Sequence, residues 1–157
     1  MELETLRYPV GKYRFSPDVD RKTLNAWIDN LDAFPQRLAA LVDGLSDAQL
    51  ESRYRQGGWT IRQVVHHLVD SHLNSYVRFK WALTEDNPTI KTYHEAQWAE
   101  LNDARTAPIQ ISLEFISGLH KRWVFMLRGL TDADFERTFF HPEYSRFLER
   151  SIRVRRY

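Results

Sequence analysis

Apolar residues recur at helical spacing in three long segments, and this pattern limits the chain to helices packed against one another. In segments 21–44, 60–84 and 111–129 the apolar positions lie three or four residues apart, which is the period of one face of an α-helix. No segment shows the strict apolar–polar alternation that indicates a strand. We therefore predict an all-α helical bundle that forms a single domain over residues 1–157.

Local signals refine the expected helices. Thr60 followed by Gln63 forms a capping box that starts the second long helix. Pro35 lies inside the apolar stripe of the first helix, so we expect a kink or a division there. The segment 86–110 is loop-like around a short helix at 92–101.

Two stretches of the chain are similar in sequence, which indicates a repeated unit. The stretches "LSDAQLESRY" (45–54) and "LTDADFERTF" (130–139) match in their apolar, hydroxyl and acidic positions, and each follows a long helix. The bundle therefore has two copies of one unit: a long helix, a short capped turn and a second long helix. The second copy has too few residues before Tyr157 for its second helix. We expect the fourth helix to be missing or incomplete, and the apolar surface so exposed to favour a homodimer.

The two ends of the chain differ from the rest. Residues 1–17 are expected to form an extended arm, because Pro9, Gly11 and Pro17 interrupt any helix. The segment "SRFLERSIRVRRY" (145–157) holds five arginines and one glutamate, and we interpret it as an atypical basic tail exposed to solvent.

Composition excludes several classes of protein. The chain has no cysteine, which rules out disulfides, thiolate metal sites and a cysteine nucleophile and fits a cytoplasmic location. A net charge of +1 argues against a nucleic-acid binder. No run of 18 apolar residues is present, so we expect neither a membrane span nor a membrane partner.

Three histidines lie close together in "GGWTIRQVVHHLVDSH" (57–72), where a metal site is an obvious hypothesis. His66, His67 and His72 are separated by one, five and six residues. None of these spacings places two side chains on one helical face, as separations of three or four would. The stretch can therefore lend one ligand to a site but cannot form a site alone.

Their positions on a helical wheel differ. His72 lies at the centre of the apolar stripe and is expected in the core, while His66 lies on the far side and is expected to face solvent. His67 lies on the flank of the stripe, in line with candidate cleft residues that could border a binding site: Ser71, Asn74 and Arg78. From the spacing alone, His67 is either a ligand or a surface residue.

Two further histidines are weaker candidates. His120 lies at the centre of the third apolar stripe, where it is either a buried core residue or a ligand facing His67 across the bundle. His141 precedes a proline in "FFHPEY" and is either a turn residue or a ligand. Asp70 is three residues from His67 and could orient its ring, although it falls on a more exposed side of the helix.

The stretch "GGWTIRQVVHHLVDSHLNSYVRFK" resembles the second helix of the DinB/YfiT-like superfamily, closest to its YfiT-type group of inferred metal-dependent hydrolases. "YPVGKY", "LTEDNPTIKTY", "HKRW" and "FFHPE" are also similar to that group, so the resemblance covers about residues 1–144. It implies an up-down four-helix bundle with an internal pseudo-repeat. It also implies a divalent metal held by three histidines, of which the helix-2 ligand matches His67. The other two ligands belong to a His-x-x-x-His motif on the fourth helix, which this chain lacks; no histidine follows His141.

The resemblance implies a metal-dependent hydrolase acting on an unknown small molecule. Bound zinc, or nickel as the second choice, would lower the pKa of a water molecule and supply hydroxide. A thiol S-transferase of the same superfamily and a non-catalytic bundle that acts by association are the alternatives. His120, His141 or a second subunit could complete the site. A truncated or frame-shifted reading frame would explain both the missing helix and the arginine-rich tail.

Overall fold

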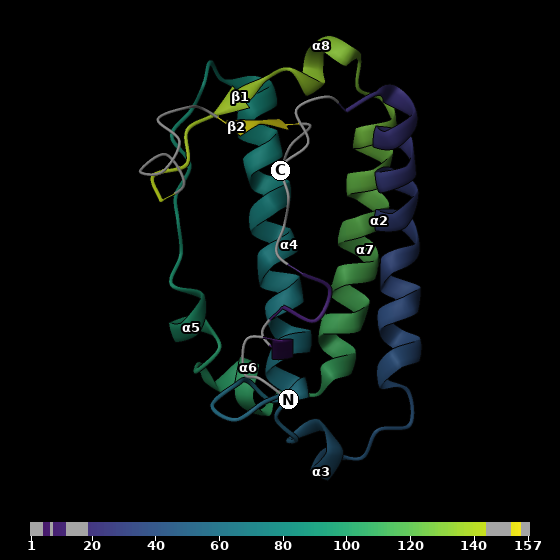
Figure 1. Ribbon diagram of the computed structural model, residues 1–157, viewed down its shortest axis with the longest axis vertical. Helices are drawn as coiled ribbons and strands as arrows, with labels where there is room; N and C mark the ends of the chain where they lie inside the picture. Colours follow the sequence, from purple (N-terminus) through teal and green to yellow (C-terminus); the bar gives the residue numbers. More distant parts are fainter. Residues whose placement is uncertain (1–4, 7, 12–18, 144–151, 155–157) are drawn as a thin grey trace.

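Three long helices build the protein in the computed structural model, which describes residues 5–6, 8–11, 19–143 and 152–154 (Figure 1). They are α2 (Arg21–Val42), α4 (Ile61–Thr84) and α7 (Ile109–Arg128), and α7 packs against both of the others. Four helices of one turn or slightly more complete the described helical part: α3 (Asp47–Leu50), α5 (Glu95–Trp98), α6 (Asn102–Thr106) and α8 (Asp132–Phe135). The all-α prediction and the three long helices are confirmed, with bounds that differ by at most a few residues.

The connection between α4 and α7 decides how the long helices run. The chain passes down α2, turns through α3 and returns along α4 (Figure 1). Residues 85–108, which include α5 and α6, then descend beside α4, so that α7 runs parallel to α4 and antiparallel to α2. The expected up-down alternation therefore holds from α2 to α4. It does not hold from α4 to α7, because the long connection returns the chain to the end of the bundle where α4 began.

The predicted start of the second helix is confirmed in detail. Thr60 is the N-cap of α4, its side chain accepts a hydrogen bond from the Gln63 backbone, and the Gln63 side chain binds the Thr60 backbone in return. Asp20 caps α2 in a similar way by accepting from the Thr23 backbone. These caps satisfy N–H groups that have no partner inside the helix.

Pro35 does not divide the first helix. It lies inside α2, which continues from Arg21 to Val42 as one element. A proline has no N–H for the carbonyl four residues earlier, which here belongs to Leu31. That carbonyl accepts a hydrogen bond from the ring of His120 instead, so the gap in the hydrogen bonding of α2 is filled from α7.

The internal pseudo-repeat is visible in the hydrogen bonds. The two echoing stretches form α3 and α8, each with a complete capping box. After α3, the Ile61 N–H donates to the Ser52 carbonyl, and after α8 the Val154 N–H donates to the Arg137 carbonyl. Ser52 and Arg137 occupy matching positions in the two stretches. Both copies therefore close the short helix by the same kind of backbone contact.

Strands were not expected, and a small pair is present. Strand β1 (Thr138–Phe139) pairs antiparallel with β2 (Ile152–Arg153). Phe139 and Val154 are fully buried in the apolar cluster of the upper bundle. Two-residue strands are too short to leave a periodic pattern in the sequence, and part of the predicted basic tail thus belongs to the packed domain. Residues 144–151 and 155–157 of that tail, and most of the expected extended arm, lie outside the described residues.

The core is divided into two apolar clusters along the bundle. The first joins the end of α4 to the second half of α7 and includes Phe79, Trp123 and Phe135. The second joins the end of α2 to the start of α4 and includes Leu38, Val65 and Ile116. Within the described ranges no fourth long helix covers α2 and α4, and no helix is long and apolar enough to cross a membrane.

Candidate functional site

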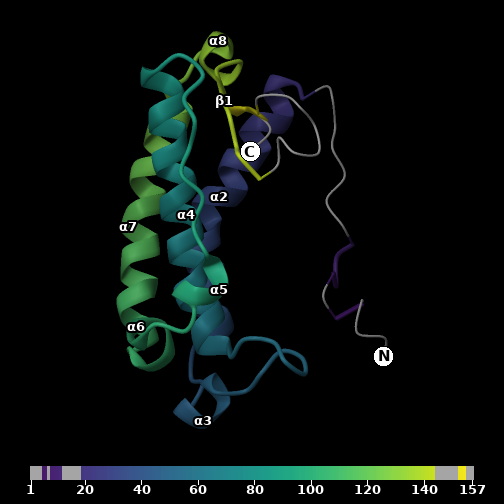
Figure 2. The same ribbon diagram turned by 90° about the vertical axis from the view of Figure 1, so that its left-hand side faces the viewer.

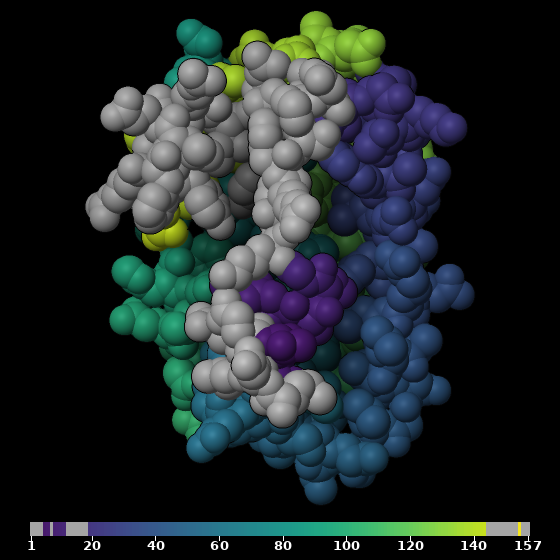
Figure 3. All heavy atoms as spheres, in the orientation of Figure 1, coloured from purple at the N-terminus to yellow at the C-terminus, as the bar shows by residue number. Residues whose placement is uncertain are grey.

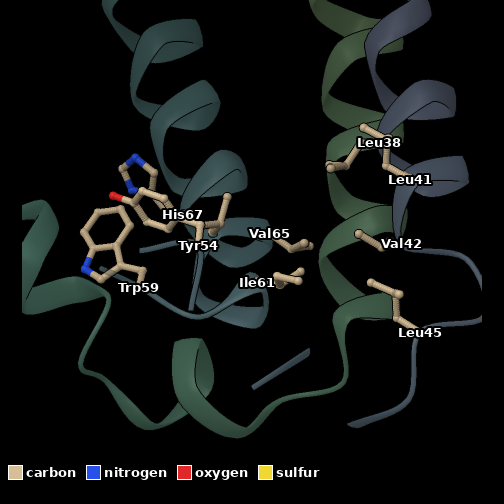
Figure 4. Close-up of a pocket in the computed structure, with 10 residues that line it drawn as sticks. Leu38, Leu41, Val42, Leu45, Tyr54, Trp59, Ile61, Val65 and His67 are labelled. Carbon is tan, nitrogen blue, oxygen red and sulfur yellow. The ribbon is translucent and has the colours of Figure 1, made fainter. Parts of the chain in front are cut away.

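An apolar cavity of about 490 Å³ lies between the end of α2 and the start of α4. In Figure 4 the aromatic residues Tyr54 and Trp59 lie on one side with His67, and residues of α2 and the turn after it lie on the other. The lining residues are Leu38, Leu41, Val42, Leu45, Tyr54, Trp59, Ile61, Val64, Val65 and His67. His67 is the titratable imidazole at an otherwise almost entirely apolar surface.

His67 is held by packing rather than by hydrogen bonds. Its ring lies 4.7 Å from the ring of Trp59, centroid to centroid. Burial lowers its pKa, and the nearby carboxylate of Glu95 opposes that shift. The imidazole is therefore neutral near pH 7, the form that binds a metal. Among the described residues, no hydrogen bond reaches either ring nitrogen of His67.

The loop before α4 shapes the aromatic wall of the cavity. Gly58 is buried, and a Cβ placed on it would lie 2.8 Å from Tyr54 Cε1 and 2.8 Å from Arg55 Cγ. Any larger residue would push the Tyr54 ring out of its place. The lack of a side chain at Gly58 therefore keeps Tyr54 in its place in the wall opposite α2.

The prediction that His66 faces solvent is wrong. Its ring is buried, with Nδ1 2.7 Å from the Ser112 hydroxyl and Nε2 3.1 Å from the Ala107 carbonyl. Burial lowers its pKa as well. The segment between α6 and α7 covers this side of α4. A helical wheel of α4 alone could not predict this, because it does not include residues outside the helix.

His72 and His120 form a hydrogen-bonded pair in the core. His120 Nδ1 donates to the Leu31 carbonyl over 2.7 Å, because a carbonyl can only accept. His120 Nε2 is then an acceptor, and His72 Nδ1 donates to it over 2.6 Å. Burial, with a smaller contribution from His120, lowers the pKa of His72 to about 4. The expectation of a core role for His72 agrees with this geometry, and His120 faces His72 rather than His67.

His141 is buried beside Arg78 and does not reach the cavity. It is 3% exposed, its Nδ1 accepts a hydrogen bond of 3.3 Å from the Glu143 N–H, and Arg78 contributes to its lowered pKa after burial. The turn interpretation of His141 is thus the better description, although its side chain points inward.

The three candidate cleft residues form hydrogen bonds away from the cavity. Two of them bind the connection after α4, and the third binds the backbone of α4 itself. Arg78 donates to the Lys91 carbonyl over 3.4 Å, and Ser71 forms a hydrogen bond with Tyr93. Asn74 donates to the Asp70 carbonyl one turn earlier. None of the three lines the cavity that contains His67.

Asp70 is a carboxylate with an unusual environment. Burial, reinforced by the charge of Asp103, raises its pKa to about 6. It lies on the side of α4 that α6 partly covers, and the sequence pattern placed it nearer to solvent. The structure records no hydrogen bond between Asp70 and the ring of His67 within its described ranges.

The described residues do not form a complete metal site. Within them, no group of three or more histidine, cysteine, aspartate or glutamate side chains is placed to hold an ion. His67 fits the role of one ligand, because its ring is neutral, accessible from the cavity and without a hydrogen-bond partner there. A four-coordinate catalytic zinc needs about three protein ligands.

Comparison with known proteins gives a consistent picture. The DinB superfamily model matches residues 30–154. Two relatives named "Putative metal-dependent hydrolase", from Bacillus mycoides (strain KBAB4) and Bacillus pumilus (strain SAFR-032), are 49% and 51% identical to this chain. The alignments cover 90% and 89% of this chain and 81% and 79% of the relatives.

A solved structure is similar over nearly the whole chain. Its description is "YfiT from Bacillus subtilis is a probable metal-dependent hydrolase with an unusual four-helix bundle topology". The two chains are 43% identical with a TM-score of 0.91, and the match covers 97% of this chain and 85% of that one.

Proposed function

Because the chain belongs to the DinB superfamily, we propose that it is a metal-dependent hydrolase in which His67 is one ligand of a divalent ion. The names of its relatives support the class of enzyme. We propose zinc as the ion, with nickel as the second choice, and a reducing cytoplasm as the location of the cysteine-free chain.

The environment of His67 is the observation that supports this role. In the described part of the chain, both ring nitrogens of His66 and of His120 form hydrogen bonds. His67 keeps both nitrogens available at the edge of the apolar cavity. A bound divalent ion would polarise a water molecule and lower its pKa towards neutrality. The cavity would hold an apolar part of a small-molecule substrate next to that water.

A single imidazole binds a divalent ion only weakly, so further donors are required. His120 and His141 are committed to other partners. We therefore propose that the remaining donors come from outside the described residues or from a second copy of the chain. A non-catalytic bundle that acts by association is the second candidate function, and the incomplete donor set favours it.

Metal stoichiometry tests the proposal. The tag-free protein would be dialysed against zinc or nickel, its metal content measured by elemental analysis and its affinity by calorimetry. We expect about one ion per chain at saturation, with binding lost in His67→Ala. The matched control is His94→Ala, which removes an exposed imidazole and should leave binding unchanged. Equal binding by the wild type and His67→Ala would contradict the assignment, and no binding by the wild type would leave the non-catalytic candidate.

A further inference from the structure

The hydrogen bonds of the histidine pair in the core fix which nitrogen of His72 carries the proton. The Leu31 carbonyl can only accept, so His120 donates at Nδ1 and accepts at Nε2 from His72 Nδ1. Burial, with smaller contributions from His120 and His67, lowers the pKa of His72 to about 4, so its ring is neutral at pH 7. A neutral imidazole has a single N–H, which His72 uses at Nδ1. Its Nε2 therefore carries a lone pair and no proton.

Two aromatic side chains hold the pair in place. The Phe34 ring lies 5.1 Å from the His72 ring and 5.5 Å from the His120 ring, centroid to centroid. Trp123 meets both imidazoles edge-on, at 6.3 Å and 6.1 Å. These contacts restrict the rotation of each ring, so the fold sets the direction of His72 Nε2. Histidines that bind metals are oriented in the same way, because they donate their other ring N–H to an acceptor.

His72 Nε2 is accessible. In the described part of the chain no hydrogen bond reaches this atom, and it is not among the side-chain atoms that are buried without a partner. The two nitrogens of an imidazole point in nearly opposite directions, and Nδ1 points at His120 on α7, so Nε2 points away from α7. In Figure 2, α7 lies at the edge of the bundle opposite residues 5–6 and 8–11. Figure 3 shows the face that bears those residues, which is the side of the bundle away from α7.

The His72 ring lies close to the apolar cavity at His67. Phe34, which contacts His72, is one helical turn before Leu38 on α2, and Leu38 lines the cavity. On α4, His67 and His72 are five residues apart, which is about 7.5 Å along the helix axis. The charge of His67 contributes to the lowered pKa of His72, in agreement with a short separation. A small molecule is therefore long enough to reach from the cavity to His72 Nε2.

We propose that His72 is a substrate-binding residue of the site at His67, where its Nε2 accepts a hydrogen bond from an O–H or N–H group of a neutral, largely apolar molecule. The apolar part of that molecule occupies the cavity of about 490 Å³, since a charged group would lose its hydration there without gaining a partner. An apolar cavity with a few directed polar contacts is typical of small-molecule sites. This role of His72 rests on the proposed function, because the bound molecule is the substrate of the hydrolase.

The two nitrogens of His72 thus have separate roles. Nδ1 stabilises the fold through its hydrogen bond to His120, and Nε2 is available to a ligand. Two substitutions separate these roles, because the side-chain amide of asparagine lies where Nδ1 was and that of glutamine lies where Nε2 was. His72→Asn keeps a donor for His120 and removes the acceptor at Nε2, whereas His72→Gln does the reverse. Circular dichroism of both variants checks that the helices still form.

Nitrogen NMR of the metal-free full chain tests the protonation of the ring. With isotope-labelled histidine at pH 7, long-range proton–nitrogen spectra distinguish the two neutral forms of each imidazole. We expect His72 to be protonated at Nδ1 and unprotonated at Nε2, and the spectrum of His72→Gln identifies its signals by their loss. The exposed His94 is the control and should show no such preference for Nδ1. A proton on His72 Nε2 would overturn the proposal.

Two isomeric probes test the contact with a ligand. n-Hexanol and methyl n-pentyl ether have the same composition, but only the alcohol donates a hydrogen bond. Titration of the metal-free protein, followed by NMR at His67, gives both dissociation constants. We expect the alcohol to bind about three- to tenfold more tightly than the ether in the wild type and in His72→Gln, and equally to the ether in His72→Asn. Equal binding by the wild type, a preference that His72→Asn retains, or binding of neither probe would overturn the proposal.

These outcomes are distinct from those of the metal test at His67. The spectra and both probe titrations are measured without metal, so they do not depend on whether an ion binds. A preference for the alcohol in a protein that binds no metal would support the binding role of His72 and reject the hydrolase. Metal binding that His67→Ala abolishes, without a preference for the alcohol, would support the hydrolase and overturn the role of His72.

Discussion

His67 and His72 lie five residues apart on α4 but in opposite chemical situations. His72 donates to His120, which donates to the Leu31 carbonyl that Pro35 leaves free. His67 packs on Trp59, and no hydrogen bond within the described residues occupies its nitrogens. Both rings are partly buried and both pKa values are lowered. Burial alone therefore does not separate a structural histidine from a candidate ligand, whereas the use of the ring nitrogens does.

Replacing His120 should produce the largest effect. His120→Ala leaves the Leu31 carbonyl and His72 Nδ1 without partners and opens a cavity in the core, because His120 is 1% exposed. We expect the free energy of unfolding to fall by about 3 kcal/mol. Urea denaturation at pH 7 measures it.

Pro35→Ala provides the control for that experiment. The new alanine N–H can bind the Leu31 carbonyl within α2, as in an uninterrupted helix. The double variant should therefore lose about 1 kcal/mol less than the sum of the two single variants. If the two losses in the free energy of unfolding simply add, then the Leu31 carbonyl does not couple Pro35 to His120.

Lowering the pH should reduce the stability of the fold through the His72–His120 pair. The pKa of His72 is about 4 in the fold, lowered mainly by burial, against 6.5 for the free side chain. Between these values the unfolded chain binds more protons, so stability falls as the pH drops from about 6.5 to about 4 and levels off below. We expect a loss of about 1–2 kcal/mol after solvent screening.

Asp70 opposes this trend and must be removed from the measurement. Its pKa is raised to about 6 from 3.8, so its folded form binds more protons in the same interval and gains stability as the pH drops. Urea midpoints should therefore be compared in an Asp70→Asn background with and without His72→Gln. A pH profile that His72→Gln leaves equally steep would show that another group causes the loss.

Replacing His67 should have the smallest effect on stability. His67→Ala removes the ring contact with Trp59 but leaves no buried polar group without a partner, so we expect a cost of about 1 kcal/mol or less. The same urea denaturation, with His94→Ala for comparison, measures it. A loss as large as that of His120→Ala would show that His67, like His120, is a structural residue.

Local chemistry explains which predictions succeeded. The capping box at Thr60 depends on two residues three positions apart, and the long helices follow from an apolar period within each segment. His66 was misplaced because Ala107, after α6, and Ser112 of α7 cover its side of α4. Asp70 was placed too near solvent because α6 packs against α4 on its side. A segment of mostly exposed residues with short helices leaves no pattern that shows which helix it covers.

The outer face of α7 shows a different limit. The sequence predicted a homodimer through the surface of a missing helix. Phe125 lies on the side of its helix opposite the apolar stripe, and its 85% exposure agrees with that position because α2 and α4 pack against the other side of α7. The homodimer itself stays a prediction until its mass is measured.

The sequence by itself determined the all-α class, the positions of the three long helices, the cap of α4, the internal repeat and, through the resemblance to the DinB/YfiT-like superfamily, His67 as the candidate ligand. These features depend on residues within a few positions of one another or on a direct match between two stretches. Tertiary structure decided which histidines are free, that Pro35 stays inside an unbroken helix, and which face of α7 remains uncovered. Those outcomes depend on pairs such as Leu31 and His120, 89 residues apart, whose contact arises only when the helices pack.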